Sequence, residues 1–165
     1  MSDLTIRLAT VDDAPAIARI HNEGIEDRVA TFETDPRSAV QVGAGLAEKG
    51  DRYPTIVGVR AGEVVAWASA GPYRNRPAYA GVAEHSVYVA RSARGAGVGR
   101  IVLDGLCRAY AERGFWKIVS RIFPENAPSL ALHERCGFRV VGVYRRHGRL
   151  DDEWRDCVIV ERLLG

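Results

Sequence analysis

A glycine-rich stretch near the middle of the chain contains the residue types that bind phosphate groups. It reads Arg91-Ser92-Ala93-Arg94-Gly95-Ala96-Gly97-Val98-Gly99-Arg100 and leads into a segment with helical apolar periodicity. The start of a helix offers unpaired backbone N–H groups and the positive end of the helix dipole, which favour an anion. Glycine lets phosphate oxygens approach the backbone closely, and three arginines add positive charge. The stretch therefore predicts a phosphorylated ligand, with a ligand-free glycine turn as the alternative.

The spacing of these glycines excludes two common phosphate-binding motifs. A dinucleotide fingerprint starting at Gly95 requires glycine where the chain has Arg100, and a P-loop requires a Gly-Lys-Ser/Thr that is missing here. The pattern Arg94-x-x-Gly97-x-Gly99 instead resembles the pyrophosphate loop of the GNAT acetyltransferases, Arg/Gln-x-x-Gly-x-Gly/Ala. The resemblance implies acetyl-CoA as co-substrate, held by Arg94, Gly95, Ala96, Gly97, Val98, Gly99 and Arg100.

A later segment resembles the second signature of the same family. The run Asn126-Ala-Pro-Ser-Leu-Ala-Leu-His133-Glu-Arg-Cys-Gly137-Phe138 has the form of a short helix that begins at asparagine and ends at Gly-Phe. Its residues Asn126, Leu130 and His133 fall on one helical face. Asn126 caps the helix or binds an amide of the pantetheine arm, and the two roles are compatible.

Acetyl transfer to an amine requires a base for the ammonium proton and a donor for the oxyanion. The resemblance implies that the strand before the glycine turn, residues 84–89, is splayed and that the pantetheine arm pairs with its open edge. The backbone of Val87, Tyr88 and Val89 is then expected to hold this arm. Glu84 begins the strand and is the candidate general base, the alternative being an exposed strand-end carboxylate.

Two residues are candidates for the acid that protonates the leaving thiolate. His133 stands where many relatives have tyrosine, and an imidazole titrates near neutrality. The alternative, that His133 has only a structural role, fits the sequence equally well. Tyr88 is the second candidate, and its alternative is simple packing.

Four stretches are similar to the phosphinothricin N-acetyltransferases within this family. They are Asp51-Arg-Tyr-Pro, Ala70-Gly-Pro-Tyr, Ser86-Val-Tyr-Val and Ser129-Leu-Ala-Leu-His-Glu, and residues 115–126 are more similar to the branch associated with arsinothricin resistance. Substrates of this group are glutamate-like amino acids with a phosphinate, arsinate or sulfoximine in place of the side-chain carboxylate. The resemblance implies acetylation of the α-amino group of such a compound, and with it detoxification or resistance.

Two arginines support an acidic substrate independently of the family resemblance. Arg74 and Arg76 lie on one short proline-braced loop, and guanidinium groups pair well with oxyanions. Solvated loop charges are the alternative. Phe32 is a candidate to contact the methylene groups of the substrate, and Glu84 lies in the same site. Rival functions are acetylation of another small amine or a protein N-terminus, and a non-catalytic acyl-CoA-binding sensor.

The elements that must position these residues follow from periodicity and turn residues. The expected strands are 5–8, 55–60, 64–69, 84–89, 116–122, 138–146 and 153–163, and the expected helices are about 11–25, 38–48, 98–113 and 126–136. Residues 71–81 and 148–152 are expected to be an irregular loop and a polar turn. This order predicts one α+β domain, 1–165, with a GNAT-like mixed β-sheet flanked by helices on both faces.

Composition narrows the class of protein further. The chain has 165 residues and a net charge of +2, too small an excess to favour nucleic acid. It has no unbroken apolar span of membrane length and no signal-peptide core, and its three cysteines have no metal-ligand spacing. We therefore expect a cytoplasmic protein without metal or membrane partner. Relatives often form dimers, so we also expect a homodimer to which the last two strands contribute.

Overall fold

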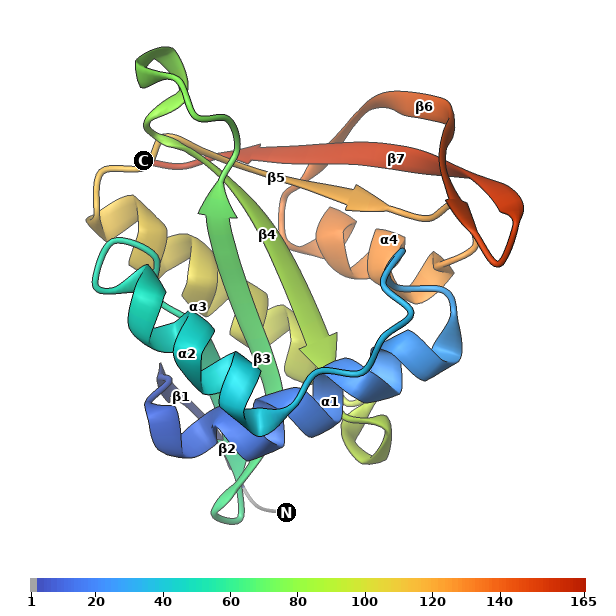
Figure 1. Cartoon of the computed structure of the whole chain (residues 1–165). Helices are drawn as coiled ribbons and strands as arrows, with labels where there is room; N and C mark the ends of the chain where they lie inside the picture. The colour runs from blue at the N-terminus through green and yellow to red at the C-terminus, as the bar shows by residue number, and fades with distance from the viewer. Residues whose placement is uncertain (1–2) are drawn as a thin grey trace.

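A computed structural model describes residues 3–165 of the protein, and in these residues seven strands form one sheet (Figure 1). The strands are β1 (Leu4–Leu8), β2 (Ile56–Arg60), β3 (Glu63–Pro72), β4 (Val82–Val89), β5 (Lys117–Ile122), β6 (Arg139–Leu150) and β7 (Glu153–Leu163). They lie in the order β1-β2-β3-β4-β5-β7-β6. Only the β4–β5 pair within the described residues is parallel. The predicted mixed sheet is confirmed, with its parallel portion at the predicted place.

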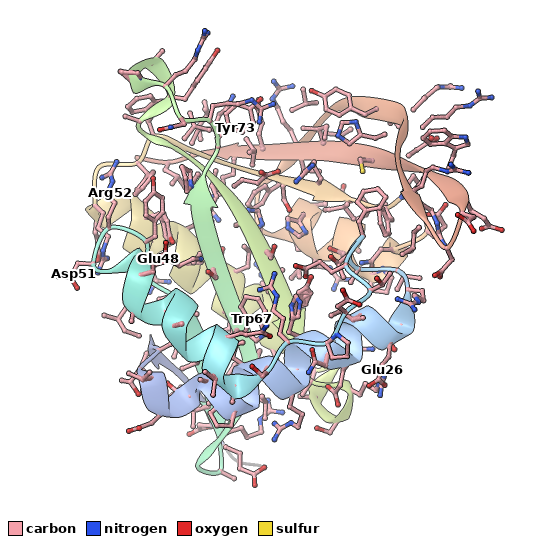
Figure 2. The ribbon with its side chains drawn as sticks, in the orientation of Figure 1. Glu26, Glu48, Asp51, Arg52, Trp67 and Tyr73 are labelled. Atoms are coloured by element: carbon pink, nitrogen blue, oxygen red, sulfur yellow. The ribbon has the colours of Figure 1, made fainter. Side chains whose placement is uncertain are left out.

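Helices cover both faces of this sheet, as predicted. The helices are α1 (Ala14–Asp27), α2 (Ala39–Lys49), α3 (Val98–Glu112) and α4 (Ala127–Arg135). One apolar cluster joins α1 to Val57 and Trp67, and another joins α3 to the alanines on the opposite side of β3. Figure 1 shows α1 and α2 in front of the sheet and α3 behind it. Trp67 lies between the α1–α2 layer and the sheet, whereas Tyr73 lies on the projecting loop after β3 (Figure 2).

Side chains accept backbone N–H groups at the turn before α1 and at the start of α2. Residues Val11–Asp13 form a 3-10 turn rather than the first turn of α1, because the Asp13 carboxylate accepts the N–H of Thr10 at 2.8 Å and fixes the turn there. In α2, Ser38 Oγ accepts the N–H of Gln41 at 3.1 Å, and Gln41 Oε1 accepts the N–H of Ser38 at 2.9 Å. Both predicted helices exist, shifted by a few residues.

Two predicted loops are more regular than the sequence suggested. Strand β6 continues to Leu150, so only Asp151 and Asp152 make the turn, both with positive φ. The cross-strand pair of Gly148 with Arg155 extends the hairpin through the expected polar turn. The expected loop 71–81 contains a 3-10 turn at Pro77–Tyr79. Gly71, the first residue of that expected loop, belongs to β3.

The sheet opens between β4 and β5. These strands pair only from Val82–Lys117 to Glu84–Val119. Past Glu84, Ser120 Oγ donates a hydrogen bond of 3.0 Å across the gap to the carbonyl of His85. The predicted splay of β4 is therefore present, and Glu84 marks the point where it begins.

None of the helices formed by residues 3–165 has both the length and the apolar character needed to cross a membrane. The three cysteines, Cys107, Cys136 and Cys157, are buried thiols. Burial raises the pKa of the Cys107 thiol to about 12 and that of Cys136 to about 11, so both remain protonated at neutral pH.

Candidate active site

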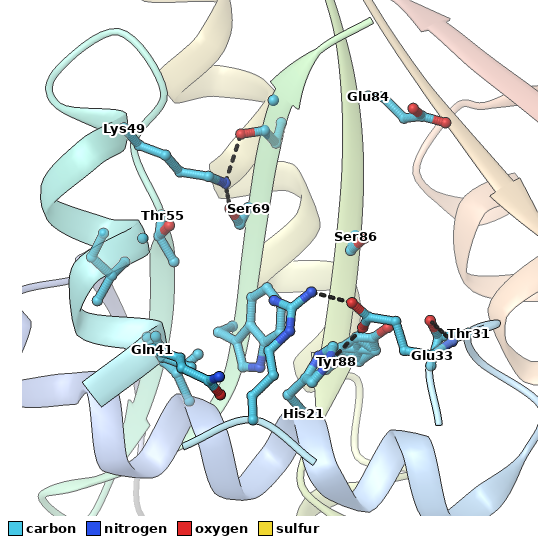
Figure 3. Close-up of a pocket in the computed structure, with 18 of the residues that line it drawn as sticks. His21, Thr31, Glu33, Gln41, Lys49, Thr55, Ser69, Glu84, Ser86 and Tyr88 are labelled. Atoms are coloured by element: carbon cyan, nitrogen blue, oxygen red, sulfur yellow. Dashed lines mark hydrogen bonds and ion pairs between the residues drawn. The ribbon is translucent and has the colours of Figure 1, made fainter. Parts of the chain in front are cut away.

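A cavity of about 490 Å³ lies between the sheet and the first two helices (Figure 3). Its walls come from α1, α2, the segment that joins them, and strands β3, β4 and β5. Polar or aromatic side chains that line it are His21, Thr31, Phe32, Glu33, Arg37, Gln41, Lys49, Thr55, Trp67, Ser69, Glu84, Ser86, Tyr88 and Arg121. A second hollow of about 250 Å³ shares Glu84, Ser86 and Tyr88 and continues to His85 and Ser120 at the splay. The cavity therefore communicates with the open edge of β4.

Glu84 lies where the two hollows meet. Side chains alternate along a strand, so Glu84, Ser86 and Tyr88 face the cavity together. The Glu84 carboxylate Oε2 is 2.8 Å from Nε of Arg121 on β5, and its side chain is 27% exposed. A carboxylate that is held in place but reached by solvent is able to accept a proton from a ligand in the cavity.

Tyr88 occupies the same wall, packed between two rings. Its ring centroid lies 5.0 Å from that of His21 and 4.9 Å from that of Trp67. Burial raises the pKa of the Tyr88 phenol to about 12, so its hydroxyl keeps its proton at neutral pH.

The floor of the cavity holds a linked group of three charged or titratable side chains. His21 Nε2 lies 2.7 Å from Glu33 Oε2, and Arg37 pairs with the other oxygen of Glu33. Burial lowers the pKa of His21, and the Arg37 charge acts in the same direction. Phe32, predicted to line the substrate site, borders this cavity beside Glu33.

A lysine enters the cavity from the last turn of α2. Lys49 Nζ donates hydrogen bonds to Ser69 Oγ and, at 2.9 Å, to the Ala70 carbonyl on β3. Burial, and to a smaller extent the Arg37 charge, lowers the pKa of this ammonium to about 8. Figure 3 shows Lys49 and Glu84 on opposite sides of the cavity, with Ser69 and Ser86 between them.

His133 lies on the other side of β4 and pairs with a second histidine. Its Nδ1 is 2.7 Å from the Ser129 carbonyl and its Nε2 is 2.9 Å from His85 Nε2, and both rings are buried. Because Nδ1 donates to the carbonyl, Nε2 of His133 accepts from His85. Burial lowers the pKa of both rings, that of His85 to about 3. The sequence suggested an imidazole that titrates near neutrality, but burial favours the neutral form of both rings, and His133 lines neither hollow.

The glycine turn presents open backbone, as expected of a phosphate-binding loop. Gly95 and Gly97 have φ of 80° and 77°, and a Cβ at either position would meet no atom within 4 Å. Among residues 3–165, no hydrogen bond has the N–H of Gly95, Ala96 or Gly97 as its donor. Gly99 differs, because a Cβ there would lie 3.1 Å from Leu132 Cδ2, so this glycine allows α3 to pack closely. The turn fits a pyrophosphate through its free N–H groups.

Two of the arginines near this turn are already paired with carboxylates of α1. Arg91 contacts Glu26 at 3.0 Å and Asp27 at 2.9 Å, and Arg94 contacts Asp27 at 2.8 Å. Arg94 Nε also donates to the Val89 carbonyl at 3.1 Å. These guanidinium groups fasten the turn to α1, whereas Arg100 is exposed and has no ion pair among the residues the structure describes.

The open edge of β4 leads toward this turn. The N–H and carbonyl of one residue point to the same side of an antiparallel strand, and the His85 carbonyl faces β5. By alternation, Val87 also points its backbone groups into the gap. Asn126 Oδ1 caps α4 by accepting the Ser129 N–H at 3.3 Å, which is the predicted capping role.

Arg74 and Arg76 lie outside this assembly of residues. Both are exposed on the loop between β3 and β4, and neither lines the cavity. The Arg74 guanidinium lies 4.3 Å from the ring centroid of Tyr73 and donates to the Tyr73 carbonyl at 3.1 Å. The loop begins directly after Gly71, which does line the cavity.

Sequence reasoning missed most of the charged residues of the cavity. His21, Arg37, Lys49 and Arg121 come from four different elements or connections and share no motif. The one signal was Phe32, which indeed lines the cavity together with its neighbours Thr31 and Glu33. No group of three His, Cys, Asp or Glu side chains suited to a metal ion occurs within residues 3–165.

Comparison with known proteins matches residues 17–138 to the acetyltransferase (GNAT) family. A phosphinothricin N-acetyltransferase of Alcaligenes faecalis is 36% identical over 97% of this chain and 82% of its own length. An L-methionine sulfoximine/L-methionine sulfone acetyltransferase of Pseudomonas paraeruginosa is 33% identical over 95% of this chain and 92% of its own. The crystal structure of a phosphinothricin acetyltransferase from Sinorhizobium meliloti in complex with AcCoA superposes with a TM-score of 0.91, at 32% identity over 98% of this chain and 89% of that one.

These matches extend over both signatures, the splayed strand and the cavity. The full-length identity and the shared fold agree with the resemblance that the glycine turn and the Asn126 segment suggested. The chain belongs to the GNAT family and is an N-acetyltransferase.

Proposed function

We propose that this enzyme transfers the acetyl group of acetyl-CoA to the α-amino group of a glutamate-like amino acid analogue such as phosphinothricin, arsinothricin or methionine sulfoximine. The observation that carries the proposal is the position of Glu84, between a cavity with charged walls and the splayed edge of β4. Relatives named for phosphinothricin and for methionine sulfoximine support this substrate class. The biological role would be resistance to such compounds.

The glycine turn and the open strand edge hold the acyl donor in this proposal. The free N–H groups from Gly95 to Gly97 and the first turn of α3 bind the pyrophosphate. The backbone of residues 87–89 receives the pantetheine arm, with Asn126 at the start of α4 as a further contact. Acetyl-CoA supplies an acetyl group activated as a thioester.

Glu84 acts as the general base. Its carboxylate accepts a proton from the substrate ammonium, directly or through one water, and Arg121 keeps the carboxylate oriented. A backbone N–H on the open edge of β4 polarises the thioester carbonyl. Tyr88 is the proposed donor to the leaving thiolate, because it faces the cavity and keeps its proton, whereas Nε2 of His133 accepts a hydrogen bond from His85.

Arg74 and Arg76 pair with acidic groups of the substrate in this proposal. Their loop starts beside the cavity, and prolines limit its freedom. Changing either arginine to alanine should raise KM for the acidic substrate and leave acetyl-CoA affinity unchanged. Equal damage to both ligands would show that the loop supports the fold instead.

A homodimer through the C-terminal hairpin remains part of the proposal. Strand β6 forms one edge of the sheet. Four of its apolar residues are each about half exposed, namely Val140, Val141, Val143 and Tyr144. Such an apolar edge favours association. Light scattering should give twice the chain mass for the wild type and the monomer mass for Val143→Glu.

A thiol-release screen tests the proposed function. Wild-type enzyme with acetyl-CoA should release CoA rapidly with phosphinothricin, arsinothricin or methionine sulfoximine, and slowly with ordinary amino acids. Preference for peptide N-termini would favour the protein-acetylating alternative. Absence of turnover with tight acetyl-CoA binding would favour the sensor.

A further inference from the structure

Three cations line the cavity, and two of them are already neutralised. Arg37 pairs with Glu33, and Arg121 pairs with Glu84 at 2.8 Å. Lys49 is the third. Among the ion pairs of residues 3–165, none includes Lys49.

The hydrogen bonds of Lys49 do not compensate its charge. Its two acceptors, Ser69 Oγ and the Ala70 carbonyl, are neutral, and an ammonium group has a third N–H to donate. The C-terminal end of α2 offers a favourable dipole, worth at most about 1 kcal/mol at an ordinary surface site. Burial outweighs that gain, because the pKa of the ammonium falls rather than rises. The cavity therefore contains an uncompensated positive charge at this position.

The position of Lys49 relative to Glu84 suits a bifunctional ligand. Ser69 pairs with Ser86 across β3 and β4, and Gly71 pairs with Glu84. Ser69 and Glu84 are therefore diagonal neighbours, roughly 7–8 Å apart, and the Lys49 ammonium lies at the Ser69 end of this diagonal. An amino acid whose amine meets Glu84 extends a side chain of a few carbon atoms over the same distance.

We propose that Lys49 binds the anionic group at the end of an acidic substrate side chain and thereby adds affinity for these analogues that those with a neutral side chain do not gain. This inference rests on the proposed function for its substrate class but adds a site that neither the glycine turn nor the β3–β4 loop supplies. Lys49 is a specificity-determining residue, and Glu84 acts on the opposite end of the same substrate.

Substitution of Lys49 separates charged from neutral substrates. Lys49→Met retains the aliphatic length and removes the charge, so kcat/KM for phosphinothricin should fall at least tenfold relative to that for methionine sulfone, whose side chain is neutral. The fall should lie in KM, and Lys49→Arg should recover part of it. The matched control is Lys117→Met, which removes the other lysine of the chain, paired with Glu161 at 2.8 Å on the sheet.

Two results of the Lys49→Met experiment would overturn the inference. A parallel loss for both substrates would mean that Lys49 binds the α-carboxylate or supports the fold, and no loss would mean that it binds no substrate group. Lys49→Gln, a neutral but polar replacement, serves as a second variant. The melting temperature of each variant shows whether a loss of activity comes from a folding defect.

A titration that needs no turnover keeps this inference separate from the proposed function. Lysine labelled with ¹³C and ¹⁵N gives side-chain signals from Lys49 and Lys117 alone. Phosphinothricin should shift the Lys49 signal and leave that of Lys117 in place, while methionine sulfone should shift neither. If the wild type acetylated none of these compounds, the proposed function would fail, and the titration would still decide the anion site. An unshifted Lys49 signal under saturating phosphinothricin contradicts the inference.

Discussion

The glycine turn and the cavity both suit negatively charged groups, but they are built in opposite ways. At the turn, the side-chain cations Arg91 and Arg94 are paired with carboxylates of α1, and the N–H groups of residues 95–97 have no acceptor within residues 3–165. In the cavity, the cation Lys49 has no carboxylate partner among the described residues. An anion at the turn is therefore bound by backbone, and an anion in the cavity by a side chain. Variants should separate the two.

The largest effect is expected at Glu84, which lies between the cavity and the splayed edge of β4. Glu84→Gln keeps the size of the side chain but cannot accept the ammonium proton. General-base catalysis is worth about 10²–10⁴-fold, so kcat at neutral pH should fall by that factor while acetyl-CoA affinity persists. The defect should shrink as pH rises, because free amine then forms without the enzyme. A wild-type kcat at pH 7, with chemistry rate-limiting, would make Glu84 only a strand-end carboxylate.

Lys49 should make stability depend on pH. Its pKa is about 8 in the folded state and 10.5 in the unfolded chain. Between these values the unfolded chain binds more protons, so the free energy of unfolding should rise with pH. Lys49→Met should remove this rise and stabilise the protein at pH 7 by about 1–3 kcal/mol, after allowance for solvent screening. Urea unfolding at pH 7 and pH 10 measures both quantities, and identical pH profiles for variant and wild type would refute the uncompensated charge.

A side chain at Gly97 should weaken the donor site alone. Gly97→Val blocks the open backbone, so acetyl-CoA affinity should fall at least tenfold, about 1.4 kcal/mol. Valine also strains a residue with φ of 77°. The matched control is Gly114→Val, at φ of 85° with equally open space near the end of α3, far along the helix from the turn. Calorimetry on the folded variants should show weakened binding for Gly97→Val only.

The arginines of the turn should have the smallest effects. Exposed ion pairs contribute roughly 0.2–1 kcal/mol each, and those of Arg91 join the turn to α1. Arg91→Ala should therefore change acetyl-CoA affinity by less than about fivefold, the factor that corresponds to 1 kcal/mol. Arg100→Ala, which removes a cation without an ion pair in the described part of the chain, should have the larger effect. The reverse order would assign phosphate binding to Arg91.

The same contrast explains what could be predicted from the sequence. The glycine turn, the Asn126 cap and the position of Glu84 are local patterns, because a few consecutive residues determine each of them. Lys49 looks like an ordinary cation at the end of a helix, and only the packing of α2 on β3 directs it into the cavity. Likewise, nothing near His133 in the sequence reveals His85, which is 48 residues away and holds it in a neutral pair.

The central claim is that the turn and the cavity bind different ligands independently. Initial rates measured over a grid of acetyl-CoA and phosphinothricin concentrations for wild type, Gly97→Val and Lys49→Met test it most directly. Gly97→Val should raise KM for acetyl-CoA alone, and Lys49→Met should raise KM for phosphinothricin alone. If both variants raised KM for the same ligand, the division between the two regions would be wrong.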